Sequence, residues 1–419
     1  MPGSVAGAAD PGLSPAAPLR AAEFAALLAP LGPFGDAPGF AVGVSGGPHS
    51  LALALLARDF VRPLGGRVLG LVADHGLRPE SAAEAAWTCR TLEAQGIPAR
   101  LLALGLPRGS AVQERARQAR LSALLGACAA AGLPFLLLGQ HAGDQAETVL
   151  FRALRGSRAT GLSGMAPRRA AAGAVILRPL LATPPARLEA LLAARGLAPL
   201  RDPSNRDPRF TRVRLRQALA DPDGTGPGTA ALGAAADAFA RRRLAQEAAL
   251  AARLGAAAAL QPEGFAWLDP AALGEDDLAV EALARLIRLL SGAEHAPPRD
   301  SVAALLRRRG GTLAGVLWDG ALLCREPAAC AAPVPARPGA LWDGRWRLLG
   351  PGPGGDVLLG ALGAASGRLA RGQRRGLPAR VLAGLPALWR EGAPLAVPAL
   401  GLGVQARLGF QPRGGALPG

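Results

Sequence analysis

One stretch near the amino terminus restricts the fold more than any other. Residues 40–44 are apolar and partly β-branched, residues 45–47 are Ser-Gly-Gly, and a helix-forming run starts at residue 48. A strand, a tight glycine turn and a helix together aim backbone N–H groups and the positive end of the helix dipole at an anion. Glycine lets the main chain approach a phosphate closely, and Ser45 and Ser50 add hydroxyl donors. The stretch therefore predicts a phosphate site in an α/β fold.

Strand-like and helix-like segments alternate on either side of this stretch. We expect strands at residues 67–73, 99–104, 135–139 and 174–177, and helices at residues 21–31, 81–95, 111–131, 144–155 and 184–195. Ser81 is the expected N-cap of its helix, because Glu84 follows at the capping-box spacing. Such alternation predicts a doubly wound parallel sheet, whose ligands bind beyond the carboxyl ends of the strands. The pairs 74–75 and 140–141 follow strand ends, so we expect them to line one crevice with the glycine loop.

The rest of the chain predicts a helical middle domain and a small α+β C-terminal domain. An Ala-rich run at residues 230–260 predicts one long helix, and short strands with Gly/Pro turns begin near residue 311. A Pro/Gly-rich linker precedes the long helix. We accordingly expect a disordered lead-in, a doubly wound domain, a helical domain and a C-terminal domain, at residues 1–20, 21–220, 229–310 and 311–419.

Every basic side chain other than histidine is an arginine. The chain has 47 Lys plus Arg and no lysine, and its formal net charge is +16. A strongly positive balance favours a polyanionic partner, nucleic acid first. The lack of tyrosine and the wealth of Ala, Gly and Pro show a compositional bias that accounts for part of this charge. Without lysine, the chain cannot have the lysine-containing loop of the Walker type.

The cysteines and the apolar runs bear on the compartment. Cys89, Cys128, Cys324 and Cys330 show no Cys-x-x-Cys spacing, which suits a reducing environment. The uncharged run at residues 121–143 is long enough to span a bilayer, but Gly132-Leu133-Pro134 divides it into a helix and a strand. We therefore expect a cytoplasmic protein with no membrane segment.

Five stretches, in this order and spacing, resemble the bacterial tRNA(Ile)-lysidine synthetase family of PP-loop ATP pyrophosphatases. They are Ser45-Gly46-Gly47-Pro48-His49-Ser50 and residues 74–81, 139–148, 154–165 and 201–216. The first is similar to the Ser-Gly-Gly-x-Asp-Ser loop of PP-loop enzymes. The resemblance spans residues 38–217 and thins beyond them, where only residues 325–327 and 385–398 match.

The resemblance implies a two-step ligase reaction on the wobble cytidine of tRNA(Ile) with a CAU anticodon. ATP would adenylate the C2 oxygen of the cytosine and release pyrophosphate, and the side-chain amine of free L-lysine would then displace AMP. ATP and Mg²⁺ are the implied cofactors, and the domains after residue 229 are implied to bind tRNA. The chemistry agrees with the residues, because attack on an α-phosphate needs hydrogen-bond donors and cations around the developing charge.

The resemblance also assigns roles to particular residues. It implies ATP binding by Ser45, Gly46, Gly47, Pro48, His49, Ser50, Asp74 and Arg120, and catalytic roles for Asp144, Arg117 and His49. It implies lysine binding by Asp144 and Glu147, Mg²⁺ binding by Asp74 and Asp144, and tRNA binding by Arg155, Arg206, Arg212, Arg214 and Arg216. Two of these assignments have a structural alternative that involves no ligand. Asp144 and Glu147 could complement a helix dipole, and Arg117 with Arg120 could form a solvated basic face.

The chain departs from the family pattern at three positions. His49 stands where the family has an aspartate that helps to hold Mg²⁺, and imidazole is a poor replacement because Mg²⁺ prefers oxygen ligands. Gly143 stands where many members have the first of two adjacent aspartates, and Val213 replaces an asparagine. Either Asp74, Asp144 and water carry the metal here, or the protein is impaired. Because the other motif positions are kept, we expect an active enzyme.

Three alternative functions remain open on sequence grounds. A non-catalytic tRNA-binding relative would explain His49 and would show no ATP–pyrophosphate exchange. A tRNA thiolation enzyme would generally use a cysteine pair, and none lies near the expected crevice. A small-molecule amidating ATP pyrophosphatase would act without tRNA. The sequence does not decide the oligomeric state, and a homodimer stays open.

Overall fold

The computed structural model describes residues 17–76, 79–105, 112–157, 159–201, 209, 211–350 and 352–413, without the side chains of residues 112–117, 159 and 160. The chain divides into two compact units, Met1–Arg243 and Leu244–Gly419, and each is considered by itself. Most of the expected lead-in, at residues 1–16, lies outside the described residues. No helix within the described ranges combines the length and the apolarity that crossing a bilayer requires.

A six-stranded sheet with the strand order β3-β2-β1-β4-β6-β5 forms the centre of the first unit. Its strands are β1 (Gly39–Val44), β2 (Arg67–Asp74), β3 (Ala99–Ala103), β4 (Phe135–Leu138), β5 (Arg168–Ala171) and β6 (Ala174–Leu177). All pairings are parallel except that of β5 with β6. The strand order reverses between β1 and β4, and open α/β sheets bind ligands beyond the strand ends at this kind of position.

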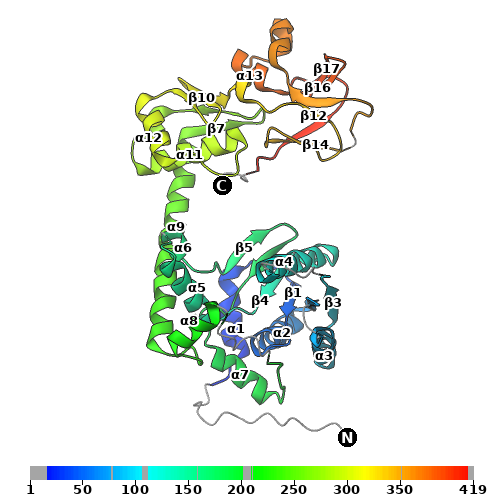
Figure 1. The fold of residues 1–419 in the computed structure, drawn as a ribbon, viewed down its shortest axis with the longest axis vertical. Helices are drawn as coiled ribbons and strands as arrows, with labels where there is room; N and C mark the ends of the chain where they lie inside the picture. Colours follow the sequence, from blue (N-terminus) through cyan, green and yellow to red (C-terminus); the bar gives the residue numbers. More distant parts are fainter. Residues whose placement is uncertain are drawn as a thin grey trace. The chain divides into compact units, whose positions relative to one another are not determined.

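Helices cover both faces of this sheet, which confirms the predicted doubly wound α/β fold (Figure 1). Phe40 and Val42 of β1 point into one core, with α1 (Ala21–Leu28), α2 (Pro48–Val61), α3 (Ser81–Ala94) and α7 (Pro185–Ala194). Ala41 points into the opposite core, under α4 (Val112–Ala130). Burial on both faces explains why the central strands are apolar throughout. The remaining helices of this unit are α5 (Ala142–Leu154), α6 (Ala159–Leu162), α8 (Thr211–Leu219) and the start of α9 (Pro227–Ala257).

The second unit is built on antiparallel sheets. Its first sheet has the order β7-β8-β11-β10-β9, and α11 and α12 pack on it through one hydrophobic core. These elements are β7 (Ala258–Gln261), β8 (Phe265–Leu268), α10 (Pro270–Leu273), α11 (Asp277–Ser291), α12 (Arg299–Arg308), β9 (Gly311–Leu313), β10 (Val316–Asp319) and β11 (Leu322–Arg325). The domain boundary expected at residue 310 falls between α12 and β9, two elements of this shared core.

Two smaller sheets complete the second unit. One has the order β12-β15-β16-β17-β18 and the other β13-β14-β19, with a hydrophobic core between them. Their strands are β12 (Val334–Pro335), β13 (Leu341–Trp342), β14 (Trp346–Leu349), β15 (Leu358–Ala361), β16 (Pro386–Arg390), β17 (Ala393–Val397), β18 (Leu402–Gly403) and β19 (Arg407–Phe410). The short helix α13 (Ala379–Gly384) joins β16 in a further core against the first sheet.

Three local predictions are wrong. Residues 258–260, expected at the end of the long helix, form β7 because they pair with β8 and close the first sheet of the second unit. Ser81 is the first helical residue of α3 rather than its N-cap, which is Glu80, and no side chain caps this helix. The helix expected to start at Asp144 begins at Ala142, because His141 provides the cap.

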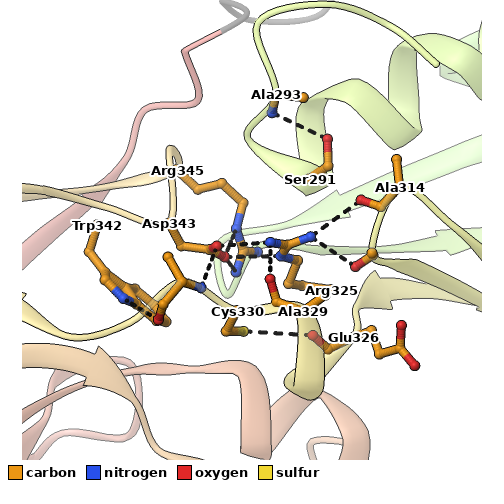
Figure 2. A network of polar contacts seen from close by, with 12 residues as sticks. Ser291, Ala293, Ala314, Arg325, Glu326, Ala329, Cys330, Trp342, Asp343 and Arg345 are labelled. Carbon is orange, nitrogen blue, oxygen red and sulfur yellow. Dashed lines mark hydrogen bonds and ion pairs between the residues drawn. The ribbon is translucent and has the colours of Figure 1, made fainter.

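A buried charge network holds the second unit together (Figure 2). The Asp343 carboxylate accepts hydrogen bonds from Arg345 Nη2 at 2.6 Å and from Arg325 Nη2 at 2.9 Å. Arg345 is 1% exposed, and the Asp343 side chain is 2% exposed. Asp343 lies in the turn between β13 and β14, whereas Arg325 ends β11, so the carboxylate ties two sheets to each other. A buried guanidinium without a counter-charge is strongly unfavourable, so this unit depends on Asp343.

Substituting Asp343→Asn should destabilise the second unit by about 3–5 kcal/mol. Two guanidinium groups in a buried site would lose the carboxylate that pairs with both of them, while the turn stays compatible with the new side chain. Urea unfolding followed by tryptophan fluorescence measures this, since five of the six tryptophans lie in this unit. The control Asp319→Asn breaks the exposed pair with Arg380 and should cost less than about 1 kcal/mol. Equal losses in the two variants would contradict the assignment.

Candidate active site

The loop after β1 forms a closed turn stabilised by two serines. Ser50 Oγ accepts the backbone N–H of Ser45 at 3.1 Å and donates to the Gly47 carbonyl at 3.0 Å. Gly47 is the N-cap of α2, and no side chain caps this helix. The first N–H groups of α2 are thus left for an acceptor from outside the helix, and the helix dipole favours an anion there.

Gly46 fixes the path of the same loop. Its φ angle is +80°, and a Cβ at this position would lie 2.6 Å from Thr88 Oγ1 and 2.7 Å from Leu200 Cδ1. The Gly46 carbonyl accepts the backbone N–H of Leu200 at 2.9 Å. Because only glycine tolerates both this conformation and this crowding, the loop geometry depends on Gly46.

The loop after β4 packs directly on the start of α2. A Cβ on Gly139 would lie 3.1 Å from the His49 carbonyl oxygen and 3.2 Å from Ser50 Cα, so the two backbones are in close contact. The His49 and His141 rings meet edge to face, with their centroids 4.1 Å apart. The glycine loop and residues 140–141, two of the three segments expected to line one crevice, therefore lie side by side at the switch point of the sheet.

His49 carries no charge in this environment. Burial lowers the pKa of His49 to about 3; His141 adds to the effect, and Asp144 opposes it. Its Nε2 atom is buried without a hydrogen-bond partner among the described residues and lies 3.9 Å from Glu189 Oε1. This distance is too long for a hydrogen bond, and a neutral ring makes no ion pair, so we treat the Glu189 contact as van der Waals.

The start of α5 carries a reciprocal cap between His141 and Asp144. His141 Nδ1 accepts the backbone N–H of Gly143, and Asp144 Oδ2 accepts the backbone N–H of His141 at 3.2 Å. A Cβ on Gly143 would lie 3.1 Å from the His141 ring. His141 therefore touches both of the departures from the family pattern in this crevice, His49 and Gly143. An aspartate at position 143 would crowd the ring that packs against His49.

Glu147 is a buried carboxylate with one free oxygen. The residue is 2% exposed, its Oε1 atom accepts Arg216 Nε at 2.7 Å, and its Oε2 atom has no partner among the described residues. Burial raises the pKa of Glu147, whereas Arg216 lowers it. Both side chains line a cavity of about 30 Å³. A cavity of this size holds a group as large as one or two water molecules, such as an ammonium.

Two of the sequence stretches brace α5 from its far side. Gln145 pairs with the backbone of Met165 through both its amide oxygen and its amide nitrogen. Arg152 Nη1 donates to the carbonyls of Gly161 and Gly164 at 2.8 and 2.7 Å. These bonds fix the rotation of α5, so the face that carries Asp144 and Glu147 is held toward the crevice.

The other predicted site residues that the structure describes have contacts of their own. Asp74 ends β2, and its carboxylate accepts the Gly76 N–H at 2.9 Å. Burial lowers the pKa of His75, and Arg120, on α4, adds to this effect. Arg155 lies over the Phe151 ring, Arg212 is close enough to influence Glu147, and Arg214 bonds Thr211 Oγ1. Arg206 and the side chain of Arg117 lie outside the described residues.

The residues fit a Mg²⁺ ion only in part. Within the described ranges, no three His, Cys, Asp or Glu side chains are arranged to hold a metal ion. One oxygen of Asp144 is already used by the His141 cap, and His49 offers nitrogen rather than oxygen. Mg²⁺ is commonly held by one or two carboxylates together with substrate phosphates. The protein alone therefore provides no complete metal cage, and a site completed by ATP phosphates remains compatible with Asp144.

Two residues of this crevice have no signal in the sequence. Glu189, on α7, is bound by Arg201 at 2.8 Å and touches His49, and Leu200 holds Gly46 through its backbone. Both lie about 150 residues after the glycine loop. Only the packing of α7 on α2 brings them there.

Comparison with known proteins agrees with this geometry. Residues 20–222 match the PP-loop domain family, so the fold and the site define a PP-loop protein. The tRNA(Ile)-lysidine synthase of Ruegeria pomeroyi is 40% identical over 382 residues, which cover 86% of this chain and 88% of that protein. Its counterpart in Novosphingobium aromaticivorans is 42% identical over 284 residues, which cover 66% of this chain and 84% of that protein.

The chain belongs to the tRNA(Ile)-lysidine synthase family. A further member, from Methylobacterium sp. strain 4-46, is 40% identical over 289 residues, which cover 68% of this chain and 83% of that protein. Among solved structures, a tRNA thiolase from Methanococcus maripaludis matches 52% of this chain and 77% of its own, with a TM-score of 0.44 and 16% identity.

Substituting Gly46→Ala should destabilise the first unit by about 1–3 kcal/mol, because a side chain at positive φ would also collide with Thr88 and Leu200. Gly47→Ala is the matched control: its φ is −71°, and the nearest atom to the new Cβ is Ser45 Oγ at 3.6 Å. Urea unfolding of the nucleotide-free protein, followed by far-ultraviolet circular dichroism, compares the two variants. A smaller loss for Gly46→Ala than for Gly47→Ala would refute the steric argument.

Proposed function

We propose that this chain forms lysidine at the wobble cytidine of an isoleucine tRNA with a CAU anticodon, using ATP and free L-lysine. In the first step the C2 oxygen of the cytosine attacks the α-phosphorus of ATP, and the bond to pyrophosphate breaks. In the second step the side-chain amine of lysine attacks C2, the bond to AMP breaks, and the amine loses its extra protons to solvent or a carboxylate. Identity of 40% across 88% of a lysidine synthase, together with a buried carboxylate on α5 that faces a cavity, carries the proposal.

The ATP phosphates would bind at the start of α2. Ser45, Gly46, Gly47, Pro48, His49 and Ser50 provide this cradle. The uncapped N–H groups of α2 favour negative charge there, and the buried bonds of Ser50 keep the loop open toward the crevice. Neutral His49 can offer at most one N–H donor to a phosphate oxygen. Asp74, Arg120, Arg117 and Asp144 are the other residues that we assign to nucleotide binding or catalysis.

The lysine amine would bind at Glu147 and Asp144. These carboxylates share one face of α5, and Glu147 Oε2 has no partner among the described residues. An ammonium group supplies three donors, and a hydrogen bond between two charged groups in a buried site is stronger than one between neutral groups. The side chains of Pro185 and Leu219 line the same cavity and offer apolar surface to the methylene stem of lysine.

The RNA backbone would contact exposed arginines of the first unit and the domains that follow. Arg155, Arg206, Arg212 and Arg214 remain our candidates, because guanidinium groups bind phosphate without reading sequence. Reading the cytidine requires an unstacked base held by its edge. Mg²⁺, if it enters with ATP, would neutralise phosphate charge next to Asp144 or Asp74, with the phosphates completing its oxygen ligands.

The decisive experiment measures AMP release from ATP with Mg²⁺, labelled L-lysine and isoleucine tRNA, omitting each component in turn. We expect release that needs both lysine and tRNA, with the label incorporated into the RNA. Release that ignores tRNA would refute the assigned substrate and favour a small-molecule enzyme. Tight tRNA binding without AMP release, restored by His49→Asp, would instead identify an impaired relative that has lost its chemistry with the loop carboxylate.

Substituting Glu147→Gln should raise the KM for lysine by roughly 10- to 100-fold, because a charge-assisted hydrogen bond of about 1.5–3 kcal/mol is lost. The KM for ATP in the same assay is the internal control and should change less than about twofold. A parallel rise in both constants would mean that Glu147 supports the site as a whole rather than the amine.

A further inference from the structure

Arg216 differs in its contacts from Arg201, which binds Glu189, and from Arg214, which binds Thr211. Its Nε donates to Glu147 Oε1 at 2.7 Å, and its Nη2 lies 4.0 Å from Asp144 Oδ1. The side chain is 44% exposed, whereas that of Glu147 is 2% exposed. Arg216 therefore reaches inward, onto the two carboxylates that we assign to the lysine amine. The expectation that it binds tRNA does not account for these contacts.

The two oxygens of Glu147 have different environments. Oε1 is taken by the guanidinium, while Oε2 has no partner among the described residues, and both residues line the cavity of about 30 Å³. A buried carboxylate is unfavourable in its charged form unless a cation is paired with it. Arg216 provides that cation at Oε1, while Oε2 is itself buried and has no partner among the described residues. An ammonium that enters the neighbouring cavity would therefore need a small movement of the lining side chains to bind Oε2, and the guanidinium would keep Oε1.

We infer that Arg216 is a positioning residue of the lysine site: by binding Oε1 it holds Glu147 beside the cavity and leaves Oε2 for the amine. The inference rests on the proposed function, because it takes the amine of lysine as the ligand. Arg216 itself need not touch lysine or tRNA. Its part is to offset the burial of this carboxylate: burial raises the pKa of Glu147 on balance, and the guanidinium opposes that shift in part.

The helix α8 is built to place this guanidinium. Val213 and Leu215 are 7% and 8% exposed and anchor α8, which packs on α5. Leu219, one turn after Arg216, lines the same cavity. Val213 stands where the family pattern has an asparagine, and here it serves the packing that fixes α8. The position of Arg216 thus follows from the apolar side of its helix.

The test compares Arg216→Gln, Arg216→Lys and the control Arg195→Gln in full-length protein. Arg195 makes a pair of similar length and exposure with Asp59, 2.8 Å and 40%, away from the crevice. The readouts are the KM values for lysine and ATP, the Kd for tRNA, and the Kd for L-lysine by calorimetry in the presence of ATP. We expect Arg216→Gln to raise the lysine KM and Kd roughly 10- to 100-fold.

The other readouts separate positioning from a structural or RNA-binding role. The ATP KM and tRNA Kd should change less than about twofold, Arg216→Lys should recover most of the lysine affinity, and Arg195→Gln should match the wild type. A lysine KM and Kd unchanged in Arg216→Gln, or a weakened tRNA Kd alone, would overturn the inference. If Arg216→Gln does not fold, the smaller neutral variant Arg216→Ala decides: a lysine Kd raised about 10-fold supports the inference, and an unchanged one overturns it.

Failure of the proposed function would look different. In that case the wild type would release no lysine-dependent AMP with tRNA, whatever the variants do. Wild-type activity that depends on lysine, combined with lysine constants insensitive to Arg216→Gln, would leave the proposed function standing and remove only the role of Arg216.

Discussion

The buried carboxylate of Glu147 is the constraint on which the rest of the active site depends. A charge that is 2% exposed needs a counter-ion, and Arg216 supplies it from α8. This pair requires α8 to pack on α5, and α5 to keep its rotation through Gln145 and Arg152. Several of the sequence stretches that identify the family thus have a structural role, because they fix the face of α5 that carries Asp144 and Glu147.

The loop at residues 45–50 depends on neutral groups, whereas the site that we propose for the lysine amine depends on charges. Its order comes from backbone geometry at Gly46, from the hydroxyl of Ser50 and from the close approach of Gly139 to α2. His49 fits this arrangement because it is uncharged, as its pKa of about 3 requires. His49 contacts His141, and His141 in turn packs on Gly143. The two departures from the family pattern, His49 and Gly143, are therefore in contact with the same side chain.

Much of the fold and some of the site follow from local sequence. Alternating apolar strands and helices predicted the doubly wound sheet. The Ser-Gly-Gly turn lies between β1 and α2 as expected, and phosphate binding there stays a prediction. Local rules failed where tertiary contacts outweighed them. Residues 258–260 pair as a strand despite an Ala-rich sequence. Ser81 does not cap α3, whereas His141, which was not expected to be a cap, caps α5. Glu189 and Leu200 reach the loop only through the packing of α7 on α2.

The sequence by itself determined the chain's elements, its phosphate loop and the family to which five ordered stretches point, because these depend on neighbouring residues and short spacings. Only the tertiary structure decided which charges meet. It paired Arg216 with Glu147 across 69 positions and Asp343 with Arg325 across 18. An arginine near other arginines in sequence looks like an RNA contact, yet burial of a distant carboxylate turns it inward. The physical reason is that a buried charge needs a counter-charge that is close in space. Which residues are close in space depends on how the core packs, and short sequence patterns do not contain that information.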